Sequence, residues 1–214
     1  AEAAPPAAGP AAFAAPGRSG GTFVLVGGLG GVGIAAARLL AARGADAVVL
    51  VGRRASDRGA LSRKQRHDVE AVEALGGGRC RVEVRACDAS NAASVDALLD
   101  EFREDLAGVV HLACVLCDKN VKDMTADDLL VPVRSKANAA LHLHAALGRG
   151  TYPNLRHFVV ATSTQDLLGA GQANYVAANQ MAVELCAARH GQNLPGLAVA
   201  LGLVLGAGML EHAP

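Results

Sequence analysis

The segment "GGLGGVG" at residues 27–33 constrains the fold of this chain more than any other stretch. It follows a short apolar run, "TFVLV" at 22–26, which has the length and composition of a buried strand. It leads into "GIAAARLLAARG" at 33–44, where apolar residues recur at helical spacing up to a terminal glycine. A glycine-rich turn that joins a strand to a helix predicts a βα unit.

The glycines of this turn favour a dinucleotide site over a plain connection, which is the alternative interpretation. Gly27, Gly31 and Gly33 fit the spacing G-x-x-x-G-x-G. At a helix N-terminus, unpaired backbone N–H groups and the helix dipole attract a pyrophosphate, and glycines let it approach closely. The residues predicted to contact the pyrophosphate are Gly27, Gly28, Leu29, Gly30, Gly31, Val32 and Gly33.

Short apolar runs alternate with helical segments along the rest of the chain. Strands are predicted at 22–26, 47–51, 80–86, 108–113, 157–162 and 197–201. Helices are predicted at 33–44, 62–75, 92–105, 126–147 and 172–190. Pro132 is expected to interrupt the fourth helix or to begin part of it. The alternation predicts an α/β fold, a Rossmann-like doubly wound parallel sheet in three layers (α/β/α).

Composition narrows the function. The chain has 20 basic and 20 acidic residues and no basic stripe interleaved with aromatic residues, so we expect no nucleic-acid partner. No apolar run is long enough to predict a membrane span. Five cysteines without a disulfide-like framework suggest a reducing, cytoplasmic setting. The Cys114–Cys117 pair has no second pair at zinc-site spacing, so we predict core packing and no metal.

The ends of the chain suggest a segment of a longer protein. Residues 1–20 are rich in Ala, Pro and Gly and lack the features of a signal peptide, so we interpret them as a linker. Residues 21–214 are predicted to form the cofactor-binding catalytic domain. Because that domain stops abruptly at Pro214, we expect it to be truncated at its C-terminus and to belong to a multidomain protein.

The residues after the second and third strands predict the type of cofactor. "GRRAS" brings Arg53 and Arg54 to the position where an acid would bind the ribose hydroxyls of NAD. A guanidinium pairs with a 2′-phosphate, so we favour NADPH, with surface arginines as the alternative. Asp88 in "ACDAS" follows the third strand, and we expect it to lie close to the edge of the cofactor's adenine ring. The alternative is that Asp88 is a simple turn or cap residue.

The far end of the sheet carries groups suited to carbonyl reduction. Strand four ends at Ala113, strand five ends at Thr162 and Ser163, and the helix that carries Tyr175 begins nearby. A phenol, with a pKa of about 10, is a poor acid near neutrality, but an adjacent ammonium lowers that pKa and feeds a proton relay. A Ser or Thr hydroxyl then holds the carbonyl. The alternative is that Tyr175 is an ordinary helix residue.

The chain resembles the ketoreductase domains of modular polyketide synthases and animal-type fatty acid synthases, in the short-chain dehydrogenase/reductase superfamily. The resemblance covers residues 21 to about 209. The matching stretches are "GTFVLVGGLGGVG", "VVLVGRR", "CDASN", "GVVHLACVL", "VRSKANAALHLHAAL", "HFVVATS", "GQANYVAANQMAVELCAARH" and "LPGLAVALG". It implies NADPH-dependent reduction of a β-ketoacyl thioester on the phosphopantetheine arm of an acyl carrier protein, with other synthase domains as partners.

The resemblance also implies roles for individual residues. Tyr175 is the proton donor, and Asn179 stands where classical members carry a lysine. Lys136, from the preceding long helix, supplies that ammonium. Asn179 argues against a third hypothesis, a sugar-nucleotide-modifying extended dehydrogenase, which requires Tyr-x-x-x-Lys. The remaining expected contacts are the hydroxyl of Ser163 (with Thr162 as the alternative), the cofactor residue Ala113 and the substrate residues Asp118 and Gln172.

Departures from the family pattern leave a competing hypothesis. The loop "TQDLLGAG" is one residue short, and Leu201 replaces a tryptophan. We also expect this segment to lack the cofactor-free half that normally precedes such a domain, and to lack most of the lid helix and last strand after "GAGM". A catalytically inactive, ketoreductase-like structural domain of a megasynthase is therefore the alternative. "LCD" at 116–118 matches the Leu-x-Asp of D-alcohol-forming relatives and predicts a (3R)-hydroxyacyl product, unless Asp118 is merely a loop acid.

Overall fold

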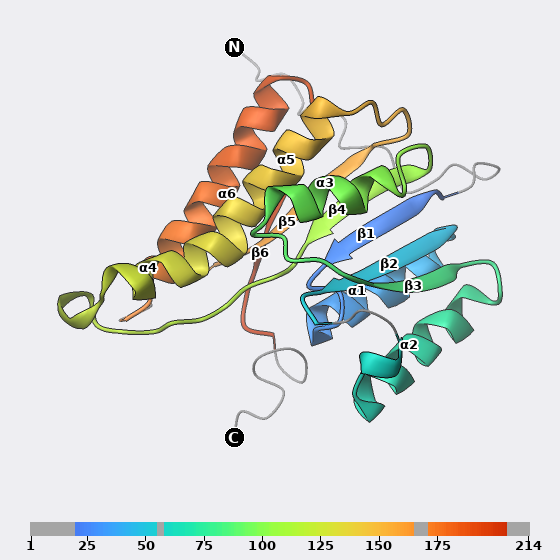
Figure 1. The fold of residues 1–214 in the computed structure, drawn as a ribbon, viewed down its shortest axis with the longest axis horizontal. Helices are drawn as coiled ribbons and strands as arrows, with labels where there is room; N and C mark the ends of the chain where they lie inside the picture. The colour runs from blue at the N-terminus through green and yellow to red at the C-terminus, as the bar shows by residue number, and fades with distance from the viewer. Residues whose placement is uncertain (1–19, 55–57, 165–170, 205–214) are drawn as a thin grey trace, which may run out of the picture.

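The computed structural model describes residues 20–54, 58–164 and 171–204. Six parallel strands form one sheet in the order β3-β2-β1-β4-β5-β6. Figure 1 shows helices on both sides of this sheet. The predicted doubly wound α/β fold is confirmed. The strands are β1 (Thr22–Val26), β2 (Ala47–Gly52), β3 (Arg81–Ala86), β4 (Leu106–His111), β5 (His157–Ser163) and β6 (Leu197–Leu201).

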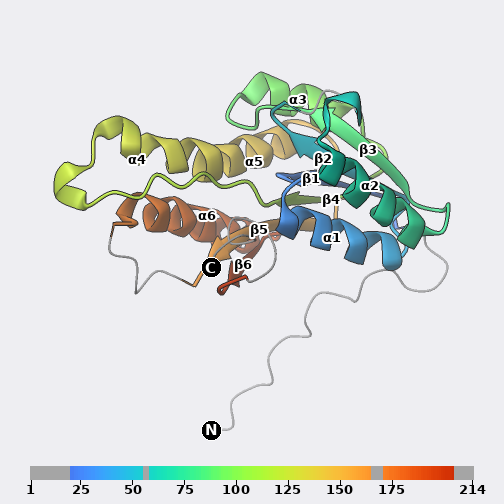
Figure 2. The same ribbon diagram turned by 90° about the horizontal axis from the view of Figure 1, so that it is seen from below.

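Helices connect the strands. The α-helices of the described residues are α1 (Gly31–Ala42), α2 (Arg63–Gly76), α3 (Ala92–Asp100), α4 (Ala126–Val133), α5 (Ala139–Arg149) and α6 (Ala173–Gly191). Shorter helical turns are η1 (Arg58–Ala60), η2 (Val121–Asp123) and the π-helical η3 (Arg134–Asn138). In both ribbon views α4, η3 and α5 follow one another as a single rod, with α6 alongside (Figures 1 and 2).

The sheet separates two hydrophobic clusters. Alternate residues of β1 point to opposite faces, as the period of a strand requires. Phe23 and Leu25 pack with α1 and α2, whereas Val24 and Val26 pack with α3, α5 and α6. From β1 the sheet is extended by β2 and β3 on one side and by β4, β5 and β6 on the other. At such a switch point between β1 and β4, doubly wound sheets have the crevice in which they bind ligands.

The boundaries differ from the prediction where tertiary contacts decide them. The helix expected at 92–105 ends at Asp100, and the fourth strand lies at Leu106–His111 rather than 108–113. The long helix expected at 126–147 is three consecutive pieces. Pro132 sits in the last turn of α4 and supplies no backbone N–H, and the backbone widens into η3 directly afterwards.

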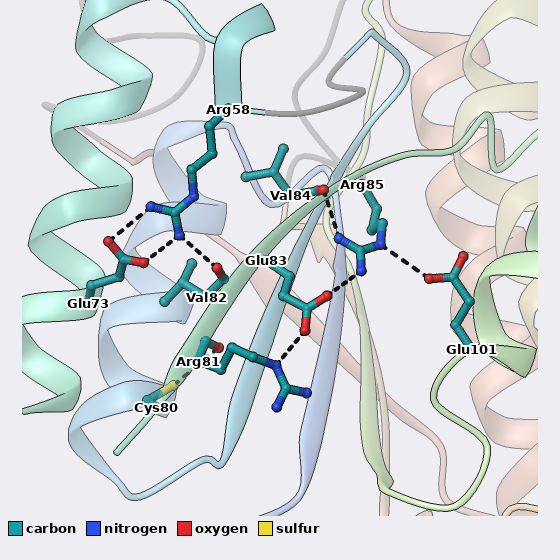
Figure 3. Close-up of polar contacts among 9 residues, drawn as sticks. All are labelled: Arg58, Glu73, Cys80, Arg81, Val82, Glu83, Val84, Arg85 and Glu101. Atoms are coloured by element: carbon teal, nitrogen blue, oxygen red, sulfur yellow. Dashed lines mark hydrogen bonds and ion pairs between the residues drawn. The ribbon is translucent and has the colours of Figure 1, made fainter. Parts of the chain in front are cut away.

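The edge strand β3 is covered by charged side chains (Figure 3). Arg58, which is paired with Glu73, donates to the carbonyl of Val82 at 2.8 Å, and Arg85 donates to the carbonyl of Val84 at 3.2 Å. An edge strand with free carbonyls invites another strand to pair with it, and charged side chains prevent this. The guanidinium groups thus occupy acceptors that an added strand would need.

None of the helices within the described residues is long and apolar enough to cross a bilayer. Among the same residues, no three His, Cys, Asp or Glu side chains are grouped so that they could hold a metal ion.

Candidate active site

The glycine turn is packed so tightly against the neighbouring backbone that several positions leave no room for a side chain. Gly27 has a φ of +82°, and a Cβ there would lie 2.7 Å from the backbone nitrogen of Ala113. A Cβ on Gly33 would lie 2.5 Å from the carbonyl oxygen of Gly28. Helix α1 begins after Gly30 without a side-chain cap and without an acidic residue in its first turn. Its first N–H groups are therefore available to an anion.

A cavity of about 840 Å³ extends from this turn along the carboxyl ends of β1, β2, β3 and β4 to η3. This volume is within the range of small-molecule and cofactor sites. Gly28 and Arg54 are not among its lining residues; Gly28 instead packs beneath the turn, where a Cβ would meet Leu25. The predicted cofactor residues that line it are Gly27, Leu29, Gly30, Gly31, Val32, Gly33, Arg53, Asp88 and Ala113.

One end of the cavity carries positive charge together with one oriented carboxylate. Arg53 and Lys64, from the segment after β2 and the first turn of α2, both line it. Asp88 Oδ1 accepts hydrogen bonds from the backbone nitrogen and the hydroxyl of Ser90, at 3.0 and 2.7 Å. These two bonds are the main causes that lower the pKa of Asp88, with Arg53 contributing. The carboxylate is thus ionised and fixed in direction.

Lys136 is buried beside the end of β5. Its side chain extends from η3, its Nζ donates to the carbonyl oxygen of Ala161 at 2.7 Å, and only 3% of the residue is exposed. Burial lowers the pKa of this ammonium to about 8. Among the described residues Lys136 forms no ion pair with a carboxylate. A buried cation without a carboxylate partner is costly, and such groups concentrate at functional sites.

His111 holds the backbone of Lys136 and was missed by the sequence reasoning. It is fully buried at the end of β4, and its Nε2 donates to the carbonyl oxygen of Lys136 at 3.1 Å. Burial, and then the charge of Lys136, lower the pKa of His111 to about 3, so the ring is neutral. Its Nδ1 has no partner among the described residues. An isolated histidine in a strand pattern gave no signal of this role.

The two candidate hydroxyls at the end of β5 have different surroundings. Thr162 is buried, and its Oγ1 has no hydrogen-bond partner among the described residues. Ser163 is half-buried at the last position of the strand. Thr162 shares its face of the sheet with Phe158 and Val160, which pack in the cluster that contains α5 and α6.

Tyr175 and Asn179 lie one helical turn apart on α6. The Nδ2 of Asn179 donates to the carbonyl oxygen of Tyr175 at 2.9 Å, whereas the buried Oδ1 of Asn179 has no partner in the described part of the chain. Tyr175 is half-buried. Because α6 packs against both η3 and β5, the elements that carry Tyr175, Lys136 and Ser163 adjoin one another. Buried polar atoms without partners are typical of sites that bind water or a ligand.

The two predicted substrate residues contact each other. Gln172 Nε2 donates to Asp118 Oδ2 at 2.8 Å, and the backbone nitrogen of Lys119 donates to the carbonyl oxygen of Gly171 at 2.7 Å. The loop after β4 is thereby joined to the start of α6. Asn174, a second residue missed by the sequence reasoning, is fully buried at the same junction.

The CxxC pair does not occupy the core. Cys114 and Cys117 are free thiols and half-buried. Cys114 lines the cavity, and Cys117 donates to Asp128 Oδ1 at 3.4 Å. Burial raises the pKa of the Cys114 thiol, which keeps it protonated and unreactive near neutral pH.

The doubly wound parallel sheet has a glycine turn before its first helix and a cavity at the carboxyl ends of its strands. This architecture is typical of Rossmann-type domains that bind dinucleotides. The model of the KR domain family matches residues 21–206. The chain therefore belongs to the KR family, the ketoreductase domains of polyketide synthases in the short-chain dehydrogenase/reductase superfamily.

Curated relatives include large synthases. The chain is 34% identical over 192 residues to Highly-reducing polyketide synthase 1 of Aureobasidium melanogenum, covering 88% of this chain and 8% of the relative. It is 39% identical over 185 residues to Polyketide synthase GfsB of Streptomyces halstedii, covering 85% of this chain and 3% of the relative. The chain thus spans a small fraction of these proteins.

Solved structures agree with this assignment. The ketoreductase from the first module of phoslactomycin biosynthesis in Streptomyces sp. HK803 superposes with a TM-score of 0.78 at 31% identity, covering 89% of this chain and 43% of that chain. An A-type ketoreductase from a modular polyketide synthase superposes with a TM-score of 0.75 at 32% identity, covering 95% of this chain and 42% of that chain.

Proposed function

We propose that this chain is an active NADPH-dependent ketoreductase domain that reduces a β-ketoacyl thioester, carried on an acyl carrier protein, to the β-hydroxyacyl thioester. We further propose that residues 1–20 are a linker, that residues 21–214 belong to a longer cytoplasmic synthase, and that its other domains are the partners of this one. The relatives are polyketide synthases, which supports this assembly.

The cofactor would lie along the cavity, and the glycine turn supports this fit. Gly27 and Gly33 allow the turn to pack closely against the backbone of Ala113 and Gly28, and the uncapped N-terminus of α1 lines the cavity where the pyrophosphate would lie. Asp88 would accept a hydrogen bond at the adenine edge, and Ala113 would contact the nicotinamide half. A 2′-phosphate on the ribose would pair with Arg53 and with Lys64, which both line the cavity.

The reaction needs a hydride on the β-carbon and a proton on the β-oxygen. A reduced nicotinamide held in the cavity would supply the hydride and its two electrons. Tyr175 donates its phenolic proton to the carbonyl oxygen as that oxygen becomes an alcohol. The hydroxyl of Ser163, or of Thr162, holds the carbonyl by a hydrogen bond that strengthens as charge develops. Lys136 and Asn179 then return a proton to Tyr175.

The observation that carries this proposal is the position of Lys136. Lys136 is 3% exposed, and its ammonium donates to the carbonyl of Ala161 near the end of β5, although burial disfavours the charged form. The buried Oδ1 of Asn179, on the helix α6 that packs against η3, has no partner within the described residues and offers an acceptor to a proton relay. The scaffold hypothesis gives no reason to bury an unpaired ammonium there.

For the stereochemical outcome we propose a (3R)-hydroxyacyl product. Asp118 lies at the junction of the β4 loop and α6 and accepts from Gln172 at 2.8 Å. This pair borders the start of the helix that carries Tyr175, so it can contact the substrate arm on one side of the carbonyl.

The test mixes the protein with NADPH and a β-ketoacyl thioester mimic, or trans-1-decalone, and follows the loss of nicotinamide absorbance. NADPH binding is measured separately by its fluorescence, and the product configuration by chiral chromatography. We expect turnover and a (3R) alcohol. Binding of NADPH without turnover supports the structural-domain alternative, and a (3S) product contradicts the role of Asp118.

A further inference from the structure

Asn174, which precedes Tyr175, uses its side-chain amide to join three parts of the chain. Its Nδ2 donates to the carbonyl oxygens of Cys117 and Asp128, at 2.7 and 2.8 Å. Its Oδ1 accepts from the backbone nitrogen of Tyr175 at 2.8 Å. The residue is fully buried, and both of its amide hydrogens are used. A buried amide satisfied in this way has one orientation only.

The contact with Asp128 follows from Pro132. In an α-helix the carbonyl of residue 128 accepts from the backbone nitrogen of residue 132. Because residue 132 is a proline, that hydrogen does not exist, and the carbonyl of Asp128 loses its partner within α4. Asn174 supplies the missing donor from another helix. Asp128 is half-buried, and a carbonyl shielded from water without a donor is costly, so the proline at 132 is better tolerated when Asn174 is present.

The contact with Tyr175 replaces a helix cap. Helix α6 begins after Gln172, whose side chain makes no capping bond. The backbone N–H of Tyr175 is one of the first groups of the helix and has no partner within it. Asn174 Oδ1 accepts this N–H. The backbone of Tyr175 is thus tied, through one amide, to the loop after β4 and to α4, which leads into Lys136.

We propose that Asn174 is the positioning residue that fixes Tyr175 relative to η3 and to the loop after β4, with Pro132 as the feature that requires it. This inference rests on the proposed ketoreduction. A displacement of about 1 Å at a reacting group can lower a rate about 100-fold. The residue therefore acts on kcat through the direction of the phenol and not through any contact with cofactor or substrate.

The kinetic test compares Asn174→Ala and Asn174→Asp with Gln180→Ala. Asn174→Asp keeps the shape of the side chain and the oxygen that accepts from the backbone N–H of Tyr175. It replaces the NH₂ group by a second oxygen, which cannot donate to the carbonyls of Cys117 and Asp128. Gln180 is exposed on the same helix and bonds only to Glu184 within the described residues. Both Asn174 variants should lower kcat about 10- to 100-fold with the Kd for NADPH unchanged, and Gln180→Ala should match wild type. Unchanged kcat in both Asn174 variants overturns the proposal.

A second measurement does not depend on activity. The chain has two tyrosines and no tryptophan, so in a Tyr152→Phe background the near-ultraviolet circular dichroism of tyrosine reports Tyr175 alone. Adding Asn174→Ala should strongly weaken that signal, and adding Gln180→Ala should leave it intact. An intact signal in both contradicts the proposal. An inactive wild-type protein that loses the signal only with Asn174→Ala refutes the proposed function and not the positioning role.

The dependence on Pro132 is tested by a double-mutant cycle on the free energy of unfolding. In Pro132→Ala the backbone nitrogen of residue 132 can donate to Asp128 again. Asn174→Ala should then destabilise the protein less in the Pro132→Ala background than in wild type. Strictly additive effects contradict the claim that the two residues satisfy one carbonyl.

Discussion

The ammonium of Lys136 donates a 2.7 Å hydrogen bond to the carbonyl oxygen of Ala161, directly before Thr162 and Ser163 on β5. Two elements that are separated in sequence, η3 and β5, are thereby joined by a buried charge. His111 holds the backbone carbonyl of Lys136 from β4, so the backbone and the ammonium of Lys136 are each held by one hydrogen bond. This relationship gives the proposed relay its rigidity.

The burial of Lys136 should make stability depend on pH. Its pKa falls from 10.5 in the unfolded chain to about 8 in the folded protein, so between these values the unfolded state binds more protons. The cost of burying the ammonium is therefore full below pH 8 and disappears as the pH rises toward 10.5. Lys136→Met should raise the free energy of unfolding at pH 7 by roughly 2–3 kcal/mol.

Denaturant titrations of wild type and Lys136→Met at several pH values check this prediction. The difference between the two proteins cancels the contribution of other groups, such as Cys87, whose pKa is raised to about 11. The increase in unfolding free energy caused by Lys136→Met should become smaller as the pH approaches 10. A gain that is constant with pH would show that the ammonium is not desolvated.

The crowding at Gly27 predicts a large effect of one methyl group. Gly27 and Gly44 both have positive φ, but a Cβ on Gly44 meets nothing within 4 Å. Gly44→Ala should cost about 1–2 kcal/mol of unfolding free energy from backbone strain alone. Gly27→Ala adds a clash with the backbone of Ala113 and should cost about 2–4 kcal/mol and weaken NADPH binding. Equal losses of stability in the two variants would refute the steric argument.

Cofactor selectivity should depend on Arg53. Replacing Arg53 by Asp puts a negative charge next to the negative 2′-phosphate. It should weaken the binding of NADPH by about 10- to 100-fold and change the affinity for NADH little. Arg54→Asp is the matched control, since Arg54 carries the same charge one residue along but does not line the cavity. Dissociation constants for both cofactors measure the outcome. A parallel loss of NADPH and NADH affinity would contradict the phosphate interaction.

Measurements of kcat and of unfolding free energy together identify which of Ser163 and Thr162 is the hydroxyl donor. We predict that Ser163→Ala lowers kcat by about 100-fold. Thr162→Val removes a buried hydroxyl that has no partner among the described residues, so it should raise the unfolding free energy by about 1 kcal/mol and leave kcat near wild type. The reverse pattern of kcat would assign the hydroxyl donor to Thr162.

The sequence predicted those parts of the fold and site that depend on local patterns. Each strand is a short apolar run, and the glycine turn lies between a strand signal and a helix signal. The sheet and the position of the glycine turn could therefore be predicted from the sequence. The termini of α3 and β4 shifted because polar residues such as Glu101 and Arg103 continue the helical pattern while the chain forms a turn.

The contacts that the sequence missed are long-range. Asn174 bonds to carbonyls 57 and 46 residues earlier, and no spacing rule joins them. The interruption near Pro132 was expected, but the helical pattern gave no sign of the π-helical turn that carries Lys136 and packs against α6. His111 was hidden because a buried strand residue gives the same pattern whether or not it binds a backbone carbonyl.

The most direct test of the account compares Tyr175→Phe with Tyr152→Phe, since the chain has no other tyrosine. The measurement is the rate of NADPH oxidation with a β-ketoacyl thioester, together with the Kd for NADPH. The account predicts that Tyr175→Phe loses about 10²- to 10⁴-fold in kcat with the Kd unchanged, while Tyr152→Phe retains wild-type turnover. Full turnover in Tyr175→Phe would contradict the central claim that this phenol delivers the proton.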